Sequence, residues 1–254
     1  MLLESCNTVP VTGRKQLKLL PSSQMLSMSA SEYDSFLSQT PPMPDADPQV
    51  KNLRKIGNDI AVATKKFLDE NGHSGLVDDF DWQFNLIDDP TLNAWCMPGG
   101  RVVFYTGILP VCDNNNGIAA VMGHEVAHAV AKHGNERMSQ QLALQGAGLS
   151  LSTILAEQPQ FTHDLALQAF GVGSQFGILA YSRKHENEAD KMGLIFMAAA
   201  GYDPREASKV WERMSALGGE QPPEFMSTHP SHETRILELE AFMDEALKYY
   251  QPRK

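Results

Sequence analysis

The chain has 254 residues, of which 42% are hydrophobic and 20% charged, as in an ordinary globular protein of one large or two small domains. Its formal net charge of −10 argues against nucleic-acid binding, because phosphate recognition needs a basic surface. No run of apolar residues approaches the roughly 18 to 20 that a membrane-crossing helix requires.

The three cysteines are too few and too scattered for a disulfide scaffold or a cysteine-rich zinc module. Cys96 and Cys112 could pair in an oxidising compartment, or both could be buried free thiols. The start, MLLESC, is too short for a signal peptide. Cys6 follows Leu-x-x, a pattern that loosely resembles a lipoprotein attachment site, although Glu4 is a poor residue there. Peripheral membrane association through a lipid on Cys6 therefore stays open.

Residues 1–48 are predicted to be an N-terminal arm and linker. Within the arm, residues 22–38 suit a helix, and the prolines of TPPMPDADP (40–48) indicate a linker. Residues 50–70 place apolar side chains at nearly helical spacing, and Asn71-Gly72 ends that helix. The rest of the chain, residues 49–254, is predicted to be one domain.

A sheet is predicted in the next part of the chain. Residues 82–88 (WQFNLID) alternate apolar and polar residues, as a half-buried strand does. Residues 92–97 and 101–107 flank Pro98-Gly99-Gly100, which favours a hairpin with a tight turn.

From Asn116 onward the pattern is almost entirely helical. Residues 141–180 are rich in Leu, Ala, Gly and Gln and suit two packed helices with a break at 158–160. Asp203-Pro204 is typical of an N-cap followed by Pro at the first helical position. Pro222-Pro223 breaks the pattern again, and residues 233–250 suit a final amphipathic helix.

The stretch HEVAHAVAKHG (124–134) carries the strongest chemical signal. His124 and His128 are four residues apart, which on a helix leaves them about 40° apart on one face, so both can reach one ion. Glu125 sits beside the first histidine, where its carboxylate can take a proton from water activated by a metal. The alternative is coincidence, expected in roughly one chain in a hundred of this size.

His133 is a poor third ligand. It lies about 180° from His124 and about 140° from His128 around the helix. It also does not match the third histidine of the longer metzincin motif. We expect His133 to face the helix dipole at the C-terminus of the helix, with Gly134 as the residue that ends it.

The third ligand is expected from SRKHENEAD (182–190). Glu186 and Asp190 share one helical face, so Glu186 could bind a metal while Asp190 holds a ligand histidine by its other ring nitrogen. Glu188 points about 200° away from Glu186 and is the weaker candidate. The alternative is an exposed helix rich in charge.

Four ordered motifs, NAWCMPGGRVVFYTGIL, HEVAHAVAKH, SRKHENEAD and THPSHETRI, resemble the zinc metallopeptidase family of HtpX and the CAAX prenyl endopeptidase. The chain is most similar to the soluble periplasmic or lipoprotein branch (LoiP and BepA) and to the mitochondrial Oma-type proteases. VPVTGRKQLKL (9–19) is also similar to the start of that branch. The resemblance covers residues 8–240. It implies an α+β, mostly α fold: a gluzincin-like metallopeptidase domain with a small antiparallel sheet beside the HExxH helix.

The resemblance also implies a role for each matching residue. His124, His128 and Glu186 would bind one Zn²⁺ per chain, and Glu125 would be the general base and acid. Asp190 would support a ligand histidine, and His229 would stabilise the oxyanion with Arg235 nearby. The hairpin would supply an edge strand on which an extended substrate lies. The residues of that strand are Asn93, Ala94, Trp95, Cys96 and Met97.

We therefore expect a zinc-dependent endopeptidase that hydrolyses unfolded or misassembled envelope proteins. The alternative is a zinc-bearing chaperone or assembly factor with latent proteolysis, and a weaker one is a helical domain with structural zinc. Residues 141–180 stand where membrane members of the family carry spans, which argues against intramembrane cleavage. Cys6 and the family branch point to the bacterial periplasm, as an outer-membrane lipoprotein. Substrate preference and oligomeric state stay open.

Overall fold

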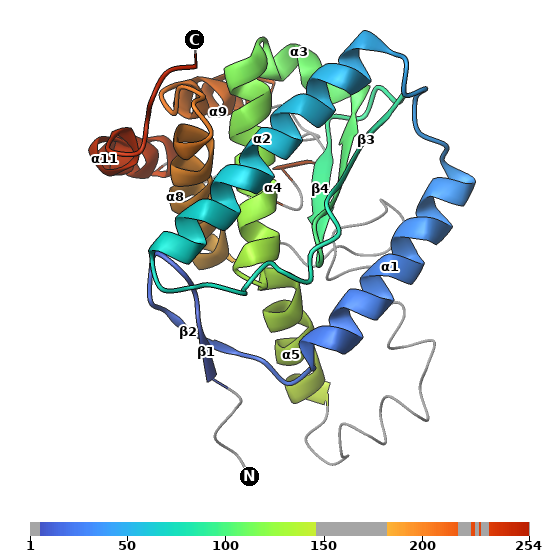
Figure 1. Ribbon diagram of the computed structural model, residues 1–254, viewed down its shortest axis with the longest axis vertical. Helices are drawn as coiled ribbons and strands as arrows, with labels where there is room; N and C mark the ends of the chain where they lie inside the picture. Colours follow the sequence, from blue (N-terminus) through green and yellow to red (C-terminus); the bar gives the residue numbers. More distant parts are fainter. Residues whose placement is uncertain (1–5, 146–181, 218–224, 227–228, 230–233, 254) are drawn as a thin grey trace.

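The structure is a computed structural model, and it describes residues 6–145, 182–217, 225–226, 229 and 234–253. A small sheet lies between a single helix on one side and a group of helices on the other (Figure 1). The predicted mostly helical α+β fold is confirmed. Three expectations fall outside the described residues: the two helices of 141–180, the break at 158–160 and the break at Pro222-Pro223. Of the first of these helices, only residues 141–145 are described.

The sheet consists of β3 (Gln83–Ile87), β4 (Ala94–Met97) and β5 (Arg101–Tyr105) in the order β3-β5-β4. The predicted hairpin is confirmed, because β4 runs antiparallel to β5 and both turn glycines, Gly99 and Gly100, have positive φ. β3, however, runs parallel to β5, so the sheet is mixed and not antiparallel throughout, as the resemblance implied. β3 precedes the hairpin and lies on the far side of β5, an arrangement that no local pattern specifies.

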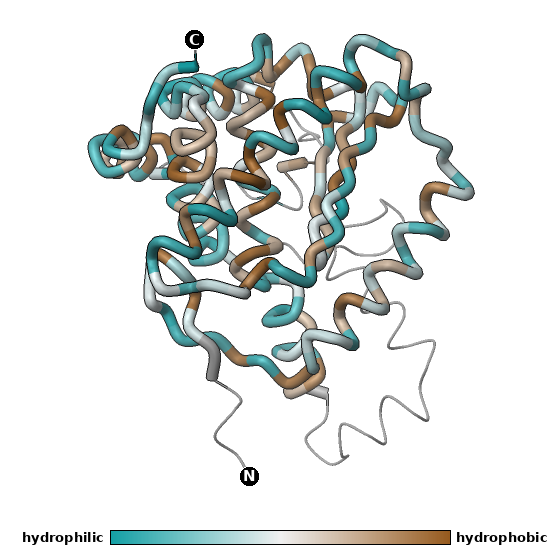
Figure 2. Tube along the Cα trace, viewed as in Figure 1, coloured by the Kyte–Doolittle hydropathy of each residue, from teal (hydrophilic) through white to brown (hydrophobic). Residues whose placement is uncertain are grey.

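Helices cover both faces of this sheet. The face with Phe84, Cys96 and Phe104 belongs to the main core, formed with helices α2 (Pro48–Glu70) and α4 (Asn115–Val130). The opposite face, with Trp95, packs against α1 (Ser22–Gln39), a helix of the N-terminal arm. β3 is consequently buried on both faces and not half-buried as predicted. Figure 2 shows hydrophobic positions recurring along the strands and along α2 and α4.

Local signals explain where α2 begins and ends. The Asp47 side chain accepts a hydrogen bond from the Gln49 N–H, and Pro48 occupies the first helical position, where its missing N–H costs nothing. Asn71 ends the helix and Gly72 follows with φ of 80°, as the sequence predicts.

The other described helices complete the layer around α4. They are η1 (Thr106–Ile108), α3 (Leu109–Cys112), α5 (His133–Gln145), α8 (Arg183–Ala199), α9 (Glu206–Ala216) and α11 (Arg235–Leu247). α9 begins later than predicted: Asp203 caps the Arg205 N–H in a preceding turn and does not cap the helix itself. A short hairpin of β1 (Cys6–Thr8) and β2 (Lys15–Leu17) precedes α1.

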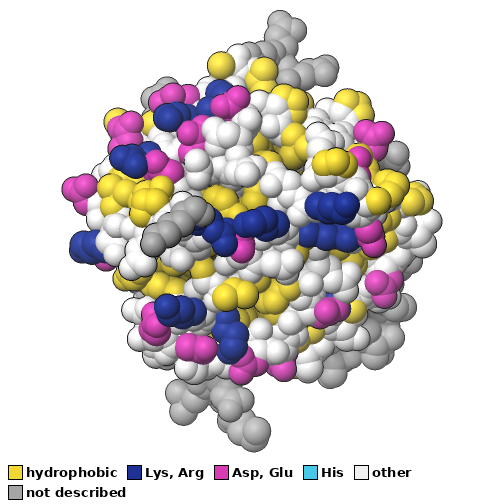
Figure 3. Space-filling model, turned by 45° about the horizontal axis from the view of Figure 1, so that its top comes forward, with side chains coloured by type: hydrophobic (Ala, Val, Ile, Leu, Met, Phe, Trp, Pro, Cys, Tyr) yellow, Lys and Arg dark blue, Asp and Glu magenta, His cyan; other side chains and the backbone are white. Residues whose placement is uncertain are grey.

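The surface carries charges of both signs. On the face shown in Figure 3, Lys and Arg side chains gather toward the middle, with Asp and Glu side chains around them. Among the residues that the structure describes, no helix is both long and apolar enough to cross a lipid bilayer.

Candidate metal centre

Two helices deliver the HExxH and SRKHENEAD motifs to one place. α4 starts at Asn114, whose side chain accepts hydrogen bonds from the Asn116 and Gly117 N–H groups. It is buried on nearly all sides, so His124 and His128 lie inside the protein. α8 starts at Ser182, whose hydroxyl accepts a hydrogen bond from the His185 N–H, and Glu186 stands in its first turn.

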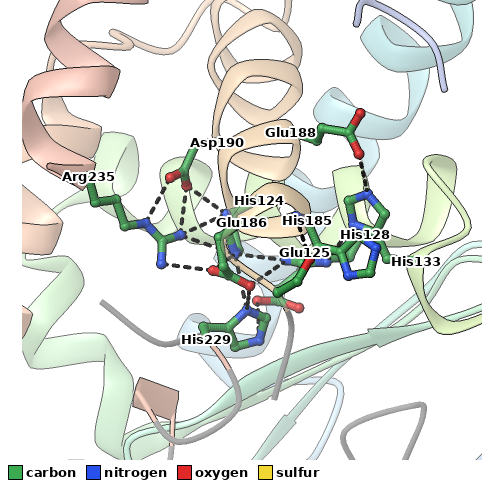
Figure 4. A network of polar contacts seen from close by, with 11 residues as sticks. His124, Glu125, His128, His133, His185, Glu186, Glu188, Asp190, His229 and Arg235 are labelled. Atoms are coloured by element: carbon green, nitrogen blue, oxygen red, sulfur yellow. Dashed lines mark hydrogen bonds and ion pairs between the residues drawn. The ribbon is translucent and has the colours of Figure 1, made fainter. Parts of the chain in front are cut away.

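Four buried side chains place their ligand-type atoms within 4.8 Å of one another: His124, His128, Glu186 and His229 (Figure 4). The Nε2 atoms of His124 and His128 are 3.1 Å apart. Glu186 Oε2 lies 3.5 Å from His124 Nε2, and its Oε1 lies 3.4 Å from His128 Nε2. His229 Nδ1 is 3.1 Å from Glu186 Oε1 and 3.2 Å from His124 Nε2.

These separations fit a zinc ion. Ligand atoms around a tetrahedral zinc with bonds of about 2.0 to 2.1 Å lie about 3.3 Å apart. The observed separations of 3.1 to 3.5 Å match that value. Imidazole nitrogens with one carboxylate are also a donor set that zinc uses. The centre can therefore hold a divalent metal.

His124 is held from behind by a carboxylate and an arginine. Its Nδ1–H donates to Asp190 Oδ1 at 2.9 Å, so Nε2 is left to face the centre. Arg235, only 1% exposed, donates to both Asp190 oxygens at 2.7 Å and pairs with Glu186 Oε2 at 2.8 Å. Its guanidinium also lies 3.3 Å from the centre of the Trp211 ring. The residues of the predicted support, Asp190 and Arg235, are thus brought together.

His133 lies behind His128, and its predicted place at the helix dipole is wrong. α4 ends at Val130, and Lys132, with φ of 57°, turns the chain into the left-handed region before α5 begins at His133. The spacing argument assumed that one continuous helix runs to His133 and that Gly134 ends it. The break instead brings His133 Nδ1 to 2.9 Å from His128 Nδ1.

Glu125 is 2% exposed, and its Oε1 has no hydrogen-bond partner among the described residues. That oxygen faces His229 Nε2 at 3.5 Å. Burial raises the pKa of Glu125, and the charges of His229 and His124 oppose the shift. A carboxylate with a raised pKa and a free oxygen beside a metal site suits proton transfer.

The protonation of the ligand-type groups follows from their surroundings. Burial lowers the pKa of His128 well below its usual value. Burial acts in the same direction on His124, but hydrogen bonds with Asp190 and Glu186 outweigh it and raise the pKa to about 9. Burial would raise the pKa of Glu186, yet the charges of His229 and Arg235 hold it well below its usual value. Because only deprotonated imidazole binds metal, loading this centre would release the His124 proton.

His229 stands closer to the other ligand-type atoms than an oxyanion donor alone requires. Its ring stacks on Phe225, with centroids 4.5 Å apart, and the backbone N–H of His229 donates to the Phe225 carbonyl. The Phe225 N–H in turn donates to the Leu92 carbonyl, which ties this segment to the start of β4. Nδ1 faces Glu186 and Nε2 faces Glu125, so His229 lies between a ligand-type carboxylate and the glutamate of HExxH.

The predicted substrate strand forms one edge of the sheet that the described residues build. The Tyr105 N–H donates to the Asn93 carbonyl, so the backbone groups of Asn93, Trp95 and Met97 face β5. Those of Ala94 and Cys96 therefore face the outer edge.

Both central cysteines are free thiols. Cys96 and Cys112 are buried and do not form the disulfide that the sequence left open. Burial, with the nearby charge of Glu125, raises the pKa of the Cys96 thiol well above its usual value.

Three side chains contact the predicted site residues but were not predicted to do so from the sequence. They are His133 beside His128, Trp211 beside Arg235, and Phe225 beside His229. His133 was visible in HEVAHAVAKHG but dismissed as a ligand. Trp211 and Phe225 carry no motif, and only the fold brings them to His124.

Comparison with known proteins identifies the family. The model of peptidase family M48 matches residues 55–243. The chain is 33% identical over 240 residues to the mitochondrial metalloendopeptidase OMA1 of Schizosaccharomyces pombe, covering 94% of this chain and 66% of that protein. It is 31% identical to the human mitochondrial metalloendopeptidase OMA1, covering 94% of this chain and 46% of that protein. It is 29% identical to the beta-barrel assembly-enhancing protease of Escherichia coli, covering 61% of this chain and 33% of that protein.

The predicted location in the bacterial periplasm is wrong. The OMA1 relatives of two yeasts and of human, which match 94 to 95% of this chain, are mitochondrial proteins. The family resemblance included both periplasmic and mitochondrial proteins. The periplasm was predicted because of the loose lipoprotein-like pattern around Cys6. Cys6 lies in strand β1, paired with Leu17, and its lipidation stays an untested prediction.

The resemblance inferred from the four motifs is confirmed at the level of the family. The matched model spans both the HExxH helix α4 and the helix α8 that carries Glu186. The chain therefore belongs to peptidase family M48, and metalloendopeptidase is the enzyme class that this membership and these relatives give it.

Proposed function

We propose that this chain is a zinc-dependent endopeptidase that hydrolyses peptide bonds of unfolded or misassembled proteins. The observation that carries the proposal is a buried glutamate, Glu125, beside four convergent ligand-type side chains, with one oxygen that makes no hydrogen bond to the described residues. His124, His128 and Glu186 would hold the ion.

Glu125 is proposed to move the proton. Zinc, when bound, supplies a Lewis acid that polarises the scissile carbonyl and lowers the pKa of water toward about 7. Glu125 takes the proton from the attacking water and later gives it to the leaving nitrogen, so that the amine departs neutral. Its raised pKa brings the carboxyl nearer to the working pH of such a transfer.

The outer edge of β4, which pairs with no further strand among the described residues, supports an extended substrate. A polypeptide added as a further strand would pair with the backbone groups of Ala94 and Cys96, which face outward, and would replace the Asn93 Oδ1 that now accepts from the Ala94 N–H. Because main-chain hydrogen bonds do not depend on side chains, such an edge can accept many sequences but only where they are unfolded.

The test is the Glu125→Gln variant, which keeps the size of the side chain and removes its basicity. We expect the zinc content to stay at the wild-type level. The rate of casein cleavage should fall by about 10²- to 10⁴-fold, which is what general-base catalysis contributes. Both are measured on purified protein, with and without a chelator. Glu206→Gln, a buried glutamate that pairs with Arg213 away from the centre, is the control. Full casein cleavage by Glu125→Gln would disprove the mechanism.

A second function, an assembly factor with latent proteolysis, is favoured by the burial of the centre. Only 2 to 3% of the surface of each central residue is exposed: His124, Glu125, His128 and His229. The Escherichia coli relative is named as a protease that enhances beta-barrel assembly. A purified chain that contains zinc, cleaves casein no faster in zinc than in chelator, and still prevents aggregation of an unfolded protein would decide for this function.

A further inference from the structure

The ligand histidine His128 is supported by another histidine and not by a carboxylate. Its Nε2 faces the centre and its Nδ1 lies 2.9 Å from His133 Nδ1 (Figure 4). Two nitrogens at that distance share one proton. If His128 binds a metal through the lone pair on Nε2, its proton is on Nδ1 and His133 Nδ1 must accept it.

This assignment fixes the other side of His133. With Nδ1 as acceptor, the neutral ring carries its proton on Nε2, which lies 3.2 Å from Glu188 Oε2. A carboxylate can only accept, so Glu188 determines which nitrogen of His133 is protonated. His133 is completely buried and stacks against His185, with centroids 4.5 Å apart, so its ring is held in this orientation.

Glu188 is in turn held by the N-terminal hairpin. Arg14 Nε donates to Glu188 Oε2 at 2.7 Å, and the Thr12 hydroxyl donates to Glu188 Oε1. The two remaining Arg14 nitrogens form a fork on Glu136 of α5, with distances of 2.8 and 2.6 Å. One guanidinium thus joins α5 to α8 and satisfies two carboxylates that are each only 4% exposed.

The turn that presents these donors has an unusual backbone. Val11 has φ of 67°, which a β-branched residue rarely adopts, and Gly13 has φ of 66°. The turn is closed by hydrogen bonds from the Val9 N–H to the Arg14 carbonyl and from the Gly13 N–H to the Val9 carbonyl. A strained turn that places Thr12 and Arg14 on one carboxylate is consistent with a positioning task.

Each of the two proposed ligand histidines is therefore held by a chain of hydrogen-bonded side chains that ends in an arginine, and the chain behind His128 contains one more group. Behind His124 stand one carboxylate and one arginine, Asp190 and Arg235. Behind His128 stand one imidazole, one carboxylate and one arginine: His133, Glu188 and Arg14. We propose that Arg14, in the N-terminal hairpin, is a positioning residue that fixes the proton and the orientation of the metal ligand His128 through Glu188 and His133. This proposal rests on the proposed metal centre.

The experiment measures zinc affinity, because a purely structural arginine would leave it unchanged. The variant Arg14→Gln keeps a polar side chain and removes the charge and the fork. We expect its zinc dissociation constant, measured by competition with a chromophoric chelator, to rise several-fold or more. The roughly 10- to 100-fold that follows loss of a direct partner of a ligand histidine is the upper bound, because Arg14 acts through Glu188 and His133. Arg14→Lys, which can serve only one carboxylate well, should fall between Arg14→Gln and wild type.

Arg54→Gln is the matched control. Arg54 also uses three contacts, with Asp45, the Phe84 carbonyl and Asn85, and its side chain is 34% exposed, compared with 25% for Arg14. Its thermal unfolding temperature without metal should fall less than that of Arg14→Gln, because Asp45 is exposed whereas Glu136 and Glu188 are buried. Its zinc dissociation constant should stay within about twofold of wild type. If Arg14→Gln does not fold, Thr12→Val, which removes one donor to Glu188, is used and should raise the constant by a smaller factor.

The possible results are distinguishable. A raised zinc dissociation constant in Arg14→Gln or Thr12→Val but not in Arg54→Gln supports the proposal. Wild-type affinity in the folded Arg14 and Thr12 variants overturns it and leaves the proposed peptidase intact. A wild-type protein that binds no zinc overturns both. A wild-type protein that binds zinc but cleaves nothing overturns only the peptidase, because the affinity comparison still applies.

Discussion

At the scale of single residues, every buried charge near the centre has an opposite charge beside it. Arg235 lies between Glu186 and Asp190, and all three are at most 8% exposed. Removing one member of such a group costs about 3 to 5 kcal/mol, because its partners stay buried without compensation. Substitutions that test a role at this centre should therefore avoid these three residues and change groups whose loss leaves no charge unpaired.

His229 can be changed more safely, because Glu186 keeps Arg235 as an opposite charge when the imidazole is removed. The two candidate roles of His229 give different kinetics. His229→Phe keeps a ring to stack on Phe225 and removes both nitrogens. If His229 stabilises the oxyanion, kcat for a casein peptide falls by about 10² to 10³ while the zinc dissociation constant is unchanged. We expect this result, measured by steady-state kinetics and chelator competition.

A zinc dissociation constant raised more than about tenfold would instead identify His229 as a metal ligand, which its Nδ1 distance of 3.1 Å to Glu186 also allows. His73→Phe is the control, since His73 lies in the turn after α2 and outside the cluster of ligand-type groups. It should change neither quantity.

At the scale of elements, the metal centre depends on how closely α4 and α8 approach. They cross at a pair of glycines, Gly123 and Gly193. A Cβ built on Gly193 would lie 2.8 Å from the His124 backbone nitrogen, and one built on Gly123 would lie 2.8 Å from the Gly193 carbonyl oxygen. These contacts are with backbone, which cannot rotate away. The glycine pair therefore sets the separation of the helices that carry His124 and Glu186.

Gly193→Ala tests whether this separation matters. Helix propensity alone would stabilise the variant by about 1 kcal/mol. We expect the clash to prevail, with a net loss of about 1 to 3 kcal/mol in the free energy of unfolding of the metal-free protein, as for an overpacked core. Zinc affinity should also fall, because α8 moves Glu186 away from the two histidines.

Asn58→Ala on the exposed face of α2 is the control for propensity, because the side chain is exposed and its truncation to Ala creates no clash. It should be neutral or slightly stabilising in urea unfolding. If Gly193→Ala were stabilised to the same extent, the glycine pair would not set the helix separation.

At the scale of the whole molecule, one cluster joins three distant parts of the chain. Asp59 of α2 accepts hydrogen bonds from Lys55, from the Tyr202 hydroxyl after α8, and from Arg253 beyond α11. Burial would raise the pKa of Asp59, but these bonds outweigh it and lower the pKa to about 2. The cluster therefore stabilises the fold only while Asp59 is ionised.

This gives a stability difference that depends on pH. Since the folded pKa lies below the unfolded value of about 4, the contribution is complete above about pH 4 and is lost as the pH falls toward 2. Asp59→Asn should lower the free energy of unfolding at pH 7 by about 1 kcal/mol, the scale of a partly exposed ion pair. In urea unfolding, the difference from wild type should shrink between pH 4 and pH 2.5.

Glu70→Gln, which removes an exposed ion pair with Lys66, is the control and should differ from wild type by less than about 0.5 kcal/mol at every pH. A constant difference between wild type and Asp59→Asn across this range would contradict the assignment.

The sequence could predict those features that depend on local spacing. His124, His128, Glu186 and Asp190 each follow a four-residue spacing within one helix, and the helix period alone puts each pair on one face. The turn of the β4–β5 hairpin followed from its glycines, and the end of α2 from Asn71-Gly72.

The rest depends on contacts between distant residues. Arg14 meets Glu136 and Glu188 across 122 and 174 positions of sequence, and no local pattern encodes that meeting. The parallel pairing of β3 with β5 is a choice of topology, not of composition. His133 was misplaced because a single residue, Lys132, takes a left-handed conformation that side-chain periodicity cannot reveal.

The groups that complete the centre are spread widely along the chain, and this has a consequence during synthesis. HExxH lies near the middle of the sequence, Glu186 about 60 residues later, and Arg235, which compensates Glu186, close to the C-terminal end. A ribosome-bound chain that has released only α4 has two imidazoles and no third donor. Because such a centre forms only as the fold forms, the growing polypeptide would not capture an ion tightly, or cut its neighbours, until the segments with Glu186 and Arg235 have also been made.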